Sequence, residues 1–127
     1  MAALIRAELA AWVGNATLSK QELQQGLGGF TSLGISEGLN FEFAGRVFRM
    51  LGDFEQGEKH ILQGIRISAE FPMSLAALYF ELAKLLTKTR RSAAEIQDAK
   101  EKAISIYNDC ESPLRVQLVQ KFFETEI

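Results

Sequence analysis

The sequence has few of the residues that cross-link a chain, bind metals or break helices. Of its 127 residues, two are proline, one is cysteine and one is histidine. Cys110 has no partner for an internal disulfide, which favours a reducing compartment, and we expect a cytoplasmic protein. His60 has no second histidine or cysteine at ligand spacing, so we interpret it as a surface or interhelix residue. We expect no metal, no cofactor and no enzymatic activity.

Clusters of positive charge and long apolar runs are also missing. The chain has 14 lysines and arginines against 16 acidic residues, and of the basic residues only Arg90 and Arg91 are adjacent. Because phosphate backbones are bound by clustered basic side chains, we expect no nucleic-acid partner. No apolar run approaches the roughly 20 residues that span a bilayer, so we expect no membrane association. Arg6 and Glu8 interrupt the apolar N-terminal stretch, which favours an amphipathic helix over a signal peptide.

Apolar residues at helical spacing are what the sequence does contain. They recur between short clusters of Gly, Ser and Asn, with the two prolines at 72 and 113, and no stretch alternates as a strand would. The pattern predicts an all-α protein of about seven helices in one domain, residues 1–127. The expected helices cover residues 2–13, 19–33, 39–51, 54–71, 73–87, 92–107 and 113–125.

Several helix starts are marked by a polar residue followed three positions later by Glu or Gln. This spacing is typical of the capping box, in which each side chain bonds the backbone N–H of the other residue. The pairs are Ser19 with Glu22, Asp53 with Gln56, and Ser92 with Glu95. Pro72 suits the first position of a helix, and Gly52 can end one in the left-handed conformation.

Small residues are concentrated in the two helices expected on either side of Gly52. They are Ala44, Gly45, Gly57 and Gly64. Each Gly lowers helix stability by roughly 1 kcal/mol relative to Ala. This cost is understandable if the two helices approach each other closely, and we predict such a contact.

A repeat of 34 residues emerges when the expected helices are overlaid. Phe41, Ala44, Gly45 and Phe48 precede Leu75, Leu78, Tyr79 and Leu82 by this interval. Ser19 precedes Asp53 by the same interval. A helix–turn–helix unit of 34 residues is the period of the tetratricopeptide repeat (TPR).

The central unit resembles the TPR pattern in its residues as well as its period. Phe41-x2-Ala44-Gly45-x2-Phe48 stands for the first helix, Gly57-x3-Ile61 for the second, and Gly52-Asp53-Phe54 for the turn. The match is good over 39–72, fair over 73–107 and weak over 7–33. Phe41 replaces the common Trp, and Pro72 lies three residues after the usual proline. The resemblance implies antiparallel helical hairpins, about 2–34, 36–71 and 73–108, stacked as a short right-handed TPR-like solenoid with a capping helix at 113–125.

The resemblance also implies a concave groove lined by the first helix of each hairpin. The residues expected there are Glu42, Arg46, Arg49, Met50, Met73, Ala76, Phe80, Ala83 and Lys84. Such a surface would suit a helical or extended protein segment with apolar anchors and some acidic residues. An alternative interpretation is that Met73 and Phe80 only pack beneath the N-terminal helices.

Two functions remain open at this stage. The first is a protein–protein interaction module, and in size and repeat count the chain resembles bacterial type III secretion chaperones, which suggests a small chaperone or adaptor. Glu42 and Arg46 stand where TPR carboxylate clamps would have a cation and an amide, so the resemblance does not extend to such a clamp. The second is a self-assembling scaffold that forms homo-oligomers through the apolar helix at 73–87 or through Phe122 and Phe123.

Overall fold

The computed structural model describes residues 2–33 and 37–125, together with their side chains except those of residues 2, 4, 26–33, 37–39 and 125. In this part of the chain the regular structure is entirely helical, with seven helices and no strand, as predicted. The helices are α1 (Ala2–Trp12), α2 (Ala16–Leu33), α3 (Glu37–Met50), α4 (Phe54–Ile67), α5 (Pro72–Lys88), α6 (Ala93–Asp109) and α7 (Pro113–Thr125). The predicted junction between hairpins at residues 34 and 36 lies outside the described residues. None of the described helices has the length and apolar character needed to cross a bilayer.

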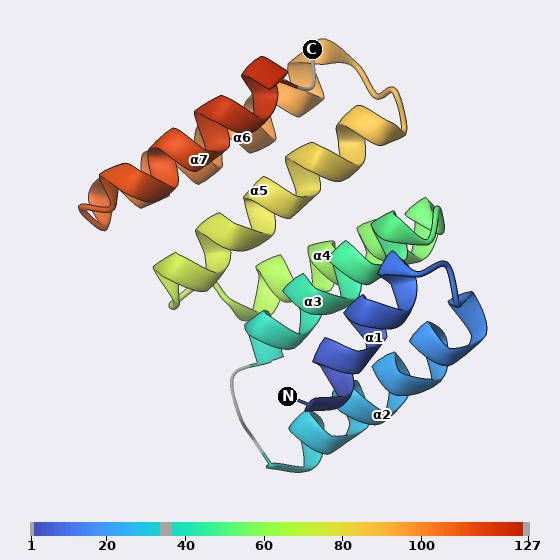
Figure 1. Ribbon diagram of the computed structural model, residues 1–127. Coiled ribbons are helices and arrows are strands. Elements are labelled where there is room, and N and C mark those ends of the chain that lie inside the picture. Colours follow the sequence, from blue (N-terminus) through green and yellow to red (C-terminus); the bar gives the residue numbers. More distant parts are fainter. Residues whose placement is uncertain (1, 34–36, 126–127) are drawn as a thin grey trace.

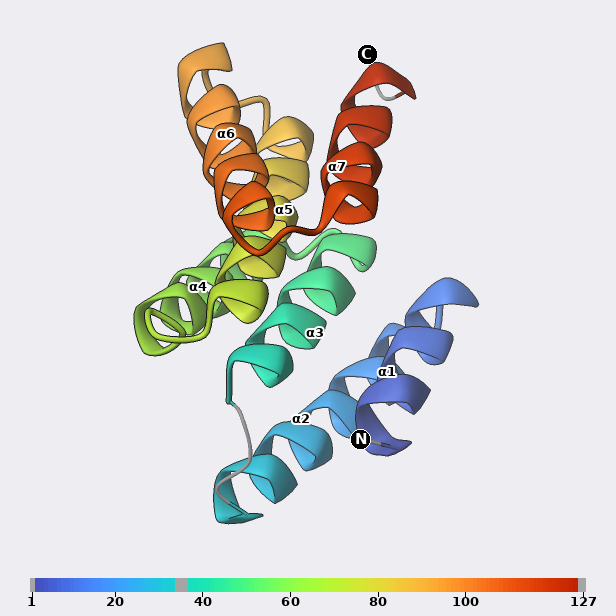
Figure 2. The same ribbon diagram turned by 90° about the vertical axis from the view of Figure 1, so that its left-hand side faces the viewer.

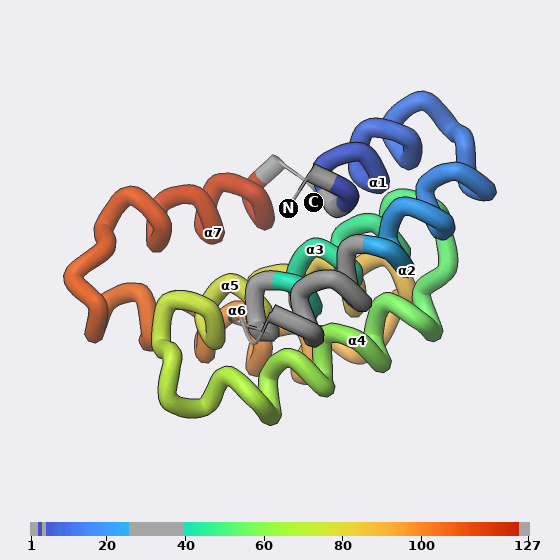
Figure 3. The backbone as a smooth tube through the Cα atoms, turned by 90° about the horizontal axis from the view of Figure 1, so that it is seen from below, coloured from blue at the N-terminus to red at the C-terminus, as the bar shows by residue number. Residues whose placement is uncertain are grey.

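The helices are arranged in two layers. Consecutive helices pack in pairs, α1 with α2, α3 with α4 and α5 with α6, as the ribbon in Figure 1 shows. Figure 2 shows the three pairs following one another from bottom to top, with α3 in contact with both α1 and α5. Seen from below in Figure 3, α1, α3, α5 and α7 form the upper layer, and α1 and α7 rise above α3 and α5 at its two sides. The odd-numbered layer is therefore curved.

Three helix ends follow the predicted chemistry. Ser92 caps α6, because its Oγ accepts a hydrogen bond from the backbone N–H of Glu95 at 3.3 Å. The Glu95 carboxylate accepts a hydrogen bond of 3.3 Å from the Ser92 hydroxyl, where the capping box predicts a bond with the backbone N–H of Ser92. Gly52 has φ of +79°, the left-handed conformation that ends α3 without a Cβ penalty. Pro72 occupies the first turn of α5, where its missing N–H leaves no bond unmade.

Two predicted caps are wrong. The α2 helix begins at Ala16, where Asn15 Oδ1 accepts a hydrogen bond from the N–H of Leu18 at 3.1 Å. Ser19 lies inside the helix, fully buried, and its Oγ donates to the carbonyl of Ala7 at 2.7 Å. Asp53 stands at the start of α4 but makes no side-chain capping bond, and its carboxylate lies 3.6 Å from Lys20 Nζ instead. Ser19 bonds α1 and Asp53 is paired with α2, and these contacts between helices compete with capping of the side chain's own helix.

The close approach of α3 and α4 is confirmed at the glycines. A Cβ added to Gly64 would lie 2.7 Å from Phe41 Cβ and 2.9 Å from Leu78 Cδ2, and one added to Gly57 would lie 3.4 Å from the carbonyl oxygen of Gly45. Ala44 differs, because it packs in a cluster formed with α1 and α2. The α4 helix also ends at Ile67, earlier than the predicted residue 71.

The buried residues form two clusters. The larger one is centred on α5, where Leu78 and Leu85 are fully buried, and it extends to Phe123 of α7. The smaller one joins α1, α2 and α3 through Ala7 and Val47.

Candidate protein-binding face

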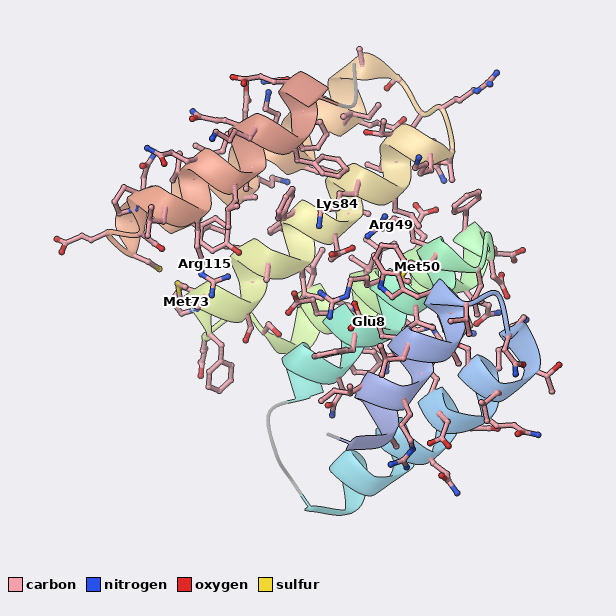
Figure 4. The ribbon with its side chains drawn as sticks, viewed as in Figure 1. Glu8, Arg49, Met50, Met73, Lys84 and Arg115 are labelled. Carbon is pink, nitrogen blue, oxygen red and sulfur yellow. The ribbon has the colours of Figure 1, made fainter. Side chains whose placement is uncertain are left out.

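One side of the odd-numbered layer carries charged side chains from four helices, and we call it the inner face. Figure 4 looks onto this side and labels Glu8 of α1, Arg49 and Met50 of α3, Met73 and Lys84 of α5, and Arg115 of α7. Arg46, Phe80 and Glu81 contact these residues and belong to the same face, as does Glu42, which is paired with Arg46. Helices far apart in the sequence therefore contribute to one surface.

Arg46 connects α3 to α1. Its Nε lies 2.9 Å from Glu8 Oε1, and its Nη2 donates a hydrogen bond of 3.4 Å to Glu8 Oε2. Its Nη1 lies 4.0 Å from Glu42 Oε1, and the guanidinium sits 4.6 Å from the centre of the Phe43 ring. About three quarters or more of each of these charged side chains is shielded from solvent. The pairing is thus less screened than an ordinary surface salt bridge.

Glu81 connects α5 to α3 and is the most deeply buried charge on the inner face. Only 3% of its side chain is exposed. Its Oε1 accepts a hydrogen bond from Lys84 Nζ at 3.0 Å, and its Oε2 lies 3.4 Å from Arg49 Nε without hydrogen-bond geometry. Burying a lone carboxylate is costly, and the two cations offset that cost by Coulomb attraction.

An aromatic cluster joins α5 to α7. The Phe80 and Phe122 rings meet edge to face with their centroids 5.7 Å apart, and Phe123 lies 6.4 Å from Phe80. Lys84 Nζ lies 4.0 Å from the centre of the Phe80 ring, so its charge is held between this ring and Glu81. Phe80 therefore packs against the C-terminal helix and not beneath the N-terminal ones.

Glu42 is the carboxylate whose titration the inner face perturbs. Burial raises its pKa above the ordinary value of 4.5, and the neighbouring Glu81 raises it further. Arg46, Lys84 and Arg115 oppose this rise by favouring the charged form. Desolvation is the largest of these effects, so the net direction is upward.

Seven of the nine predicted groove residues have accessible or half-buried side chains, and two do not. Ala76 and Ala83 are fully buried in the larger core cluster, so a partner cannot contact them directly. They were predicted from their spacing on α5, but α5 is covered on that side by its neighbours. Met73 is 41% exposed, and Met50 is half-buried between α3 and the first helix pair.

The three cations predicted to contact a partner are not free to do so. Arg46, Arg49 and Lys84 are already paired with carboxylates of the chain itself. Sequence reasoning missed the partners Glu8 and Glu81. Glu81 could have been found, because a carboxylate on an otherwise apolar helix requires a nearby cation. Glu8 could not, because its position opposite Arg46 depends on how α1 packs on α3.

His60 lies between α3 and α4. Its ring is tilted against those of Phe48 and Phe41, with centroids 5.0 and 6.0 Å apart, and its Nδ1 lies 2.8 Å from the carbonyl oxygen of Gln56. This is the interhelix position expected from the sequence. Within residues 2–33 and 37–125, no three His, Cys, Asp or Glu side chains are grouped so as to hold a metal ion.

Comparisons of the chain with protein-family models, with curated proteins and with solved structures find no match.

Proposed function

We propose that this chain is a non-enzymatic protein-binding module, a TPR-like helical repeat protein whose hairpins stack as a short right-handed solenoid. The pairing of α1 with α2, α3 with α4 and α5 with α6 supports this proposal, as does the alternation of helices between two layers. The register supports it too, since Ala44 and Leu78, which occupy equivalent positions of the 34-residue period, are both fully buried.

The bound molecule is a helical or extended segment of another protein, and it lies along the inner face. The observation that carries this proposal is the convergence of Glu8, Arg46, Arg49, Lys84 and Arg115 from four helices onto one curved layer. A module of this kind fits a small cytoplasmic chaperone or adaptor. Met50 and Met73 provide adaptable apolar contact, since Met side chains repack easily around different partners.

The charge pattern sets the orientation of the segment. Since Arg46, Arg49 and Lys84 are paired internally, an acidic residue of the partner must compete with Glu8, Glu42 or Glu81 for them. Arg115 lies at the end of the inner face where Met73 is also found, and its side chain is exposed. We expect an acidic residue of the partner near Arg115 and its apolar residues against the two methionines.

Peptide selection tests this proposal and does not require the natural partner. Peptides that bind the wild-type chain are first selected from a random display library. Fluorescence anisotropy then measures the affinity of these peptides for the wild type and for the double variant Met50→Gln/Met73→Gln. Loss of two buried methionine contacts lowers affinity by about tenfold or more, because each is worth about 1.5–3 kcal/mol when fully covered.

The matched control is Leu62→Gln/Ile67→Gln on the opposite layer. These residues of α4 are 45% and 39% exposed, comparable with the 41% of Met73. The control variant retains wild-type affinity if the inner face is the binding site. An equal loss of affinity in both variants, or a loss in the control alone, would show that the peptides do not bind along the inner face.

A further inference from the structure

The apolar pattern of α1 is inverted relative to an ordinary amphipathic helix. Its buried residues are the small ones, with Ala7, Ala10 and Ala11 exposed by 8% or less. Because alanine side chains are single methyl groups, α1 lies close to α2 and α3, and the hydroxyl of Ser19 of α2 reaches the backbone carbonyl of Ala7. The large apolar residues of α1 consequently point elsewhere.

These large residues, with Val13 of the turn that follows, form an exposed stripe along α1, consisting of Ile5, Leu9, Trp12 and Val13. Their exposed fractions are 47%, 60%, 73% and 81%. The spacing of four, three and one places them along one side of the helix. A helix that is apolar on two opposite sides is typically covered on both. Here α2 and α3 cover only the alanine side.

We propose that the α1 stripe binds the α1 stripe of a second copy of this chain in an antiparallel, two-fold arrangement. The stripe itself has no charged residue. The nearby charges of α1 are committed within the chain, with Arg6 Nε 2.9 Å from Glu22 Oε2 and Glu8 paired with Arg46. Two copies can therefore meet at this stripe without placing like charges opposite each other. Because Arg6 and Glu8 are already paired, neither favours a different protein of opposite charge as the partner.

The size of the stripe fits a weak dimer. Four large side chains exposed to this degree offer on the order of 500 Å² per copy, at the upper end for apolar patches on monomers. Two such surfaces bury about 1,000 Å² in total, which is near the lower limit for a specific interface.

The other end of the row offers an alternative that can be distinguished. On α7, Leu114 and Leu118 are 73% and 59% exposed. Pairing of this end with the α1 stripe of another copy would be head-to-tail and would not close, giving open-ended assembly. The α1 stripe has four large side chains against two on α7, and exposed Arg115 lies between those two in the sequence. We therefore assign the contact to α1 alone.

Trp12 is the only tryptophan of the chain and reports directly on this contact. Sedimentation equilibrium of the full chain is combined with tryptophan emission over about 1–500 μM, the range in which an interface of this size associates. The mass rises from 14.1 kDa toward twice that value and stops there, and the emission maximum shifts to shorter wavelength over the same concentrations. A constant mass of 14.1 kDa with unchanged emission would overturn the proposal.

Two variants with equal exposure locate the interface. Leu9→Glu replaces a residue that is 60% exposed and makes the chain monomeric, with at least about a tenfold rise in the dissociation constant. Leu118→Glu replaces one that is 59% exposed and leaves the dimer intact. Since both sites are exposed, far-UV circular dichroism stays unchanged in both variants. If Leu118→Glu dissociates the dimer, or if the measured mass rises beyond that of a dimer, the contact is head-to-tail and the proposal is contradicted.

Discussion

Single residues on the inner face show how burial and charge oppose each other, and Glu42 is the clearest case. Its side chain is 20% exposed, its Oε1 lies 4.0 Å from Arg46 Nη1, and the carboxylate of Glu81 acts on it by Coulomb repulsion. Burial raises its pKa, so the folded protein holds the Glu42 proton more tightly than the unfolded chain does. The stability that comes from protonation is present below the ordinary pKa of 4.5 and is lost as pH rises through the folded pKa.

The substitution Glu42→Gln should remove this pH dependence. At pH 7 the variant should have a higher free energy of unfolding than the wild type, because it does not bury a charge. Near pH 4, where Glu42 is protonated, the two proteins should be equal. Urea unfolding followed by circular dichroism at both pH values measures the difference.

The control for this comparison is Glu70→Gln, which changes an exposed carboxylate in the turn after α4. It should leave the pH profile of the wild type unchanged. If Glu42→Gln were less stable than the wild type at pH 7, attraction to Arg46 would outweigh desolvation, and our account of Glu42 would be wrong.

Residue roles were predictable from the sequence only where they depend on nearby residues. Ser92 caps α6 as predicted, because its Oγ accepts a hydrogen bond from the backbone N–H three residues later. Ser19 has the same local signature but bonds the carbonyl of Ala7. That bond depends on the packing of α2 against α1, about which the spacing of Ser19 and Glu22 says nothing.

At the scale of elements, the α3–α4 contact depends on the absence of side chains at particular glycines. Gly64 lies against Phe41 Cβ, an atom fixed to the backbone of α3, at 2.7 Å from where its own Cβ would stand. Gly57 is less tightly enclosed, because its nearest neighbour is the flexible end of Leu85 at 3.2 Å. Alanine gains about 1 kcal/mol of helix propensity at either position.

The substitutions Gly64→Ala and Gly57→Ala should therefore have different effects. At Gly64 the overpacking cost of about 1–3 kcal/mol should exceed the gain in propensity, and the free energy of unfolding should fall. At Gly57 the two effects should nearly cancel. Urea unfolding of both variants compares them, and a stabilised Gly64→Ala variant would show that the helices can separate at no cost.

The existence and type of the helices were predictable, whereas their limits were less so. Apolar periodicity and Pro72 were sufficient to place α5. The α4 helix ends at Ile67, and the N–H of buried Ser68 still bonds the carbonyls of Gly64 and Ile65 in its last turn. The apolar residues up to Phe71 had suggested a longer helix, but Phe71 is 58% exposed.

For the whole molecule, the curved layer of α1, α3, α5 and α7 is the feature on which the proposed function depends. The sequence indicated which side chains face this layer, and Arg46, Arg49 and Lys84 do lie there. It could not indicate that Ala76 and Ala83 are fully covered, because that depends on the side chains of neighbouring helices. Nor could it show that Phe122 and Phe123 pack inward against Phe80, which removes Phe123 as a surface for self-assembly.

Site-specific photo-crosslinking in cells of the source organism tests the central claim most directly. A photoreactive phenylalanine derivative is placed at Met50 or Met73 on the inner face, and at Leu62 or Gln97 on the opposite layer. We predict that a protein other than the chain itself is captured from Met50 and Met73 and that the two outer positions capture little. Capture of the same protein mainly from Leu62 or Gln97 would contradict binding along the inner face.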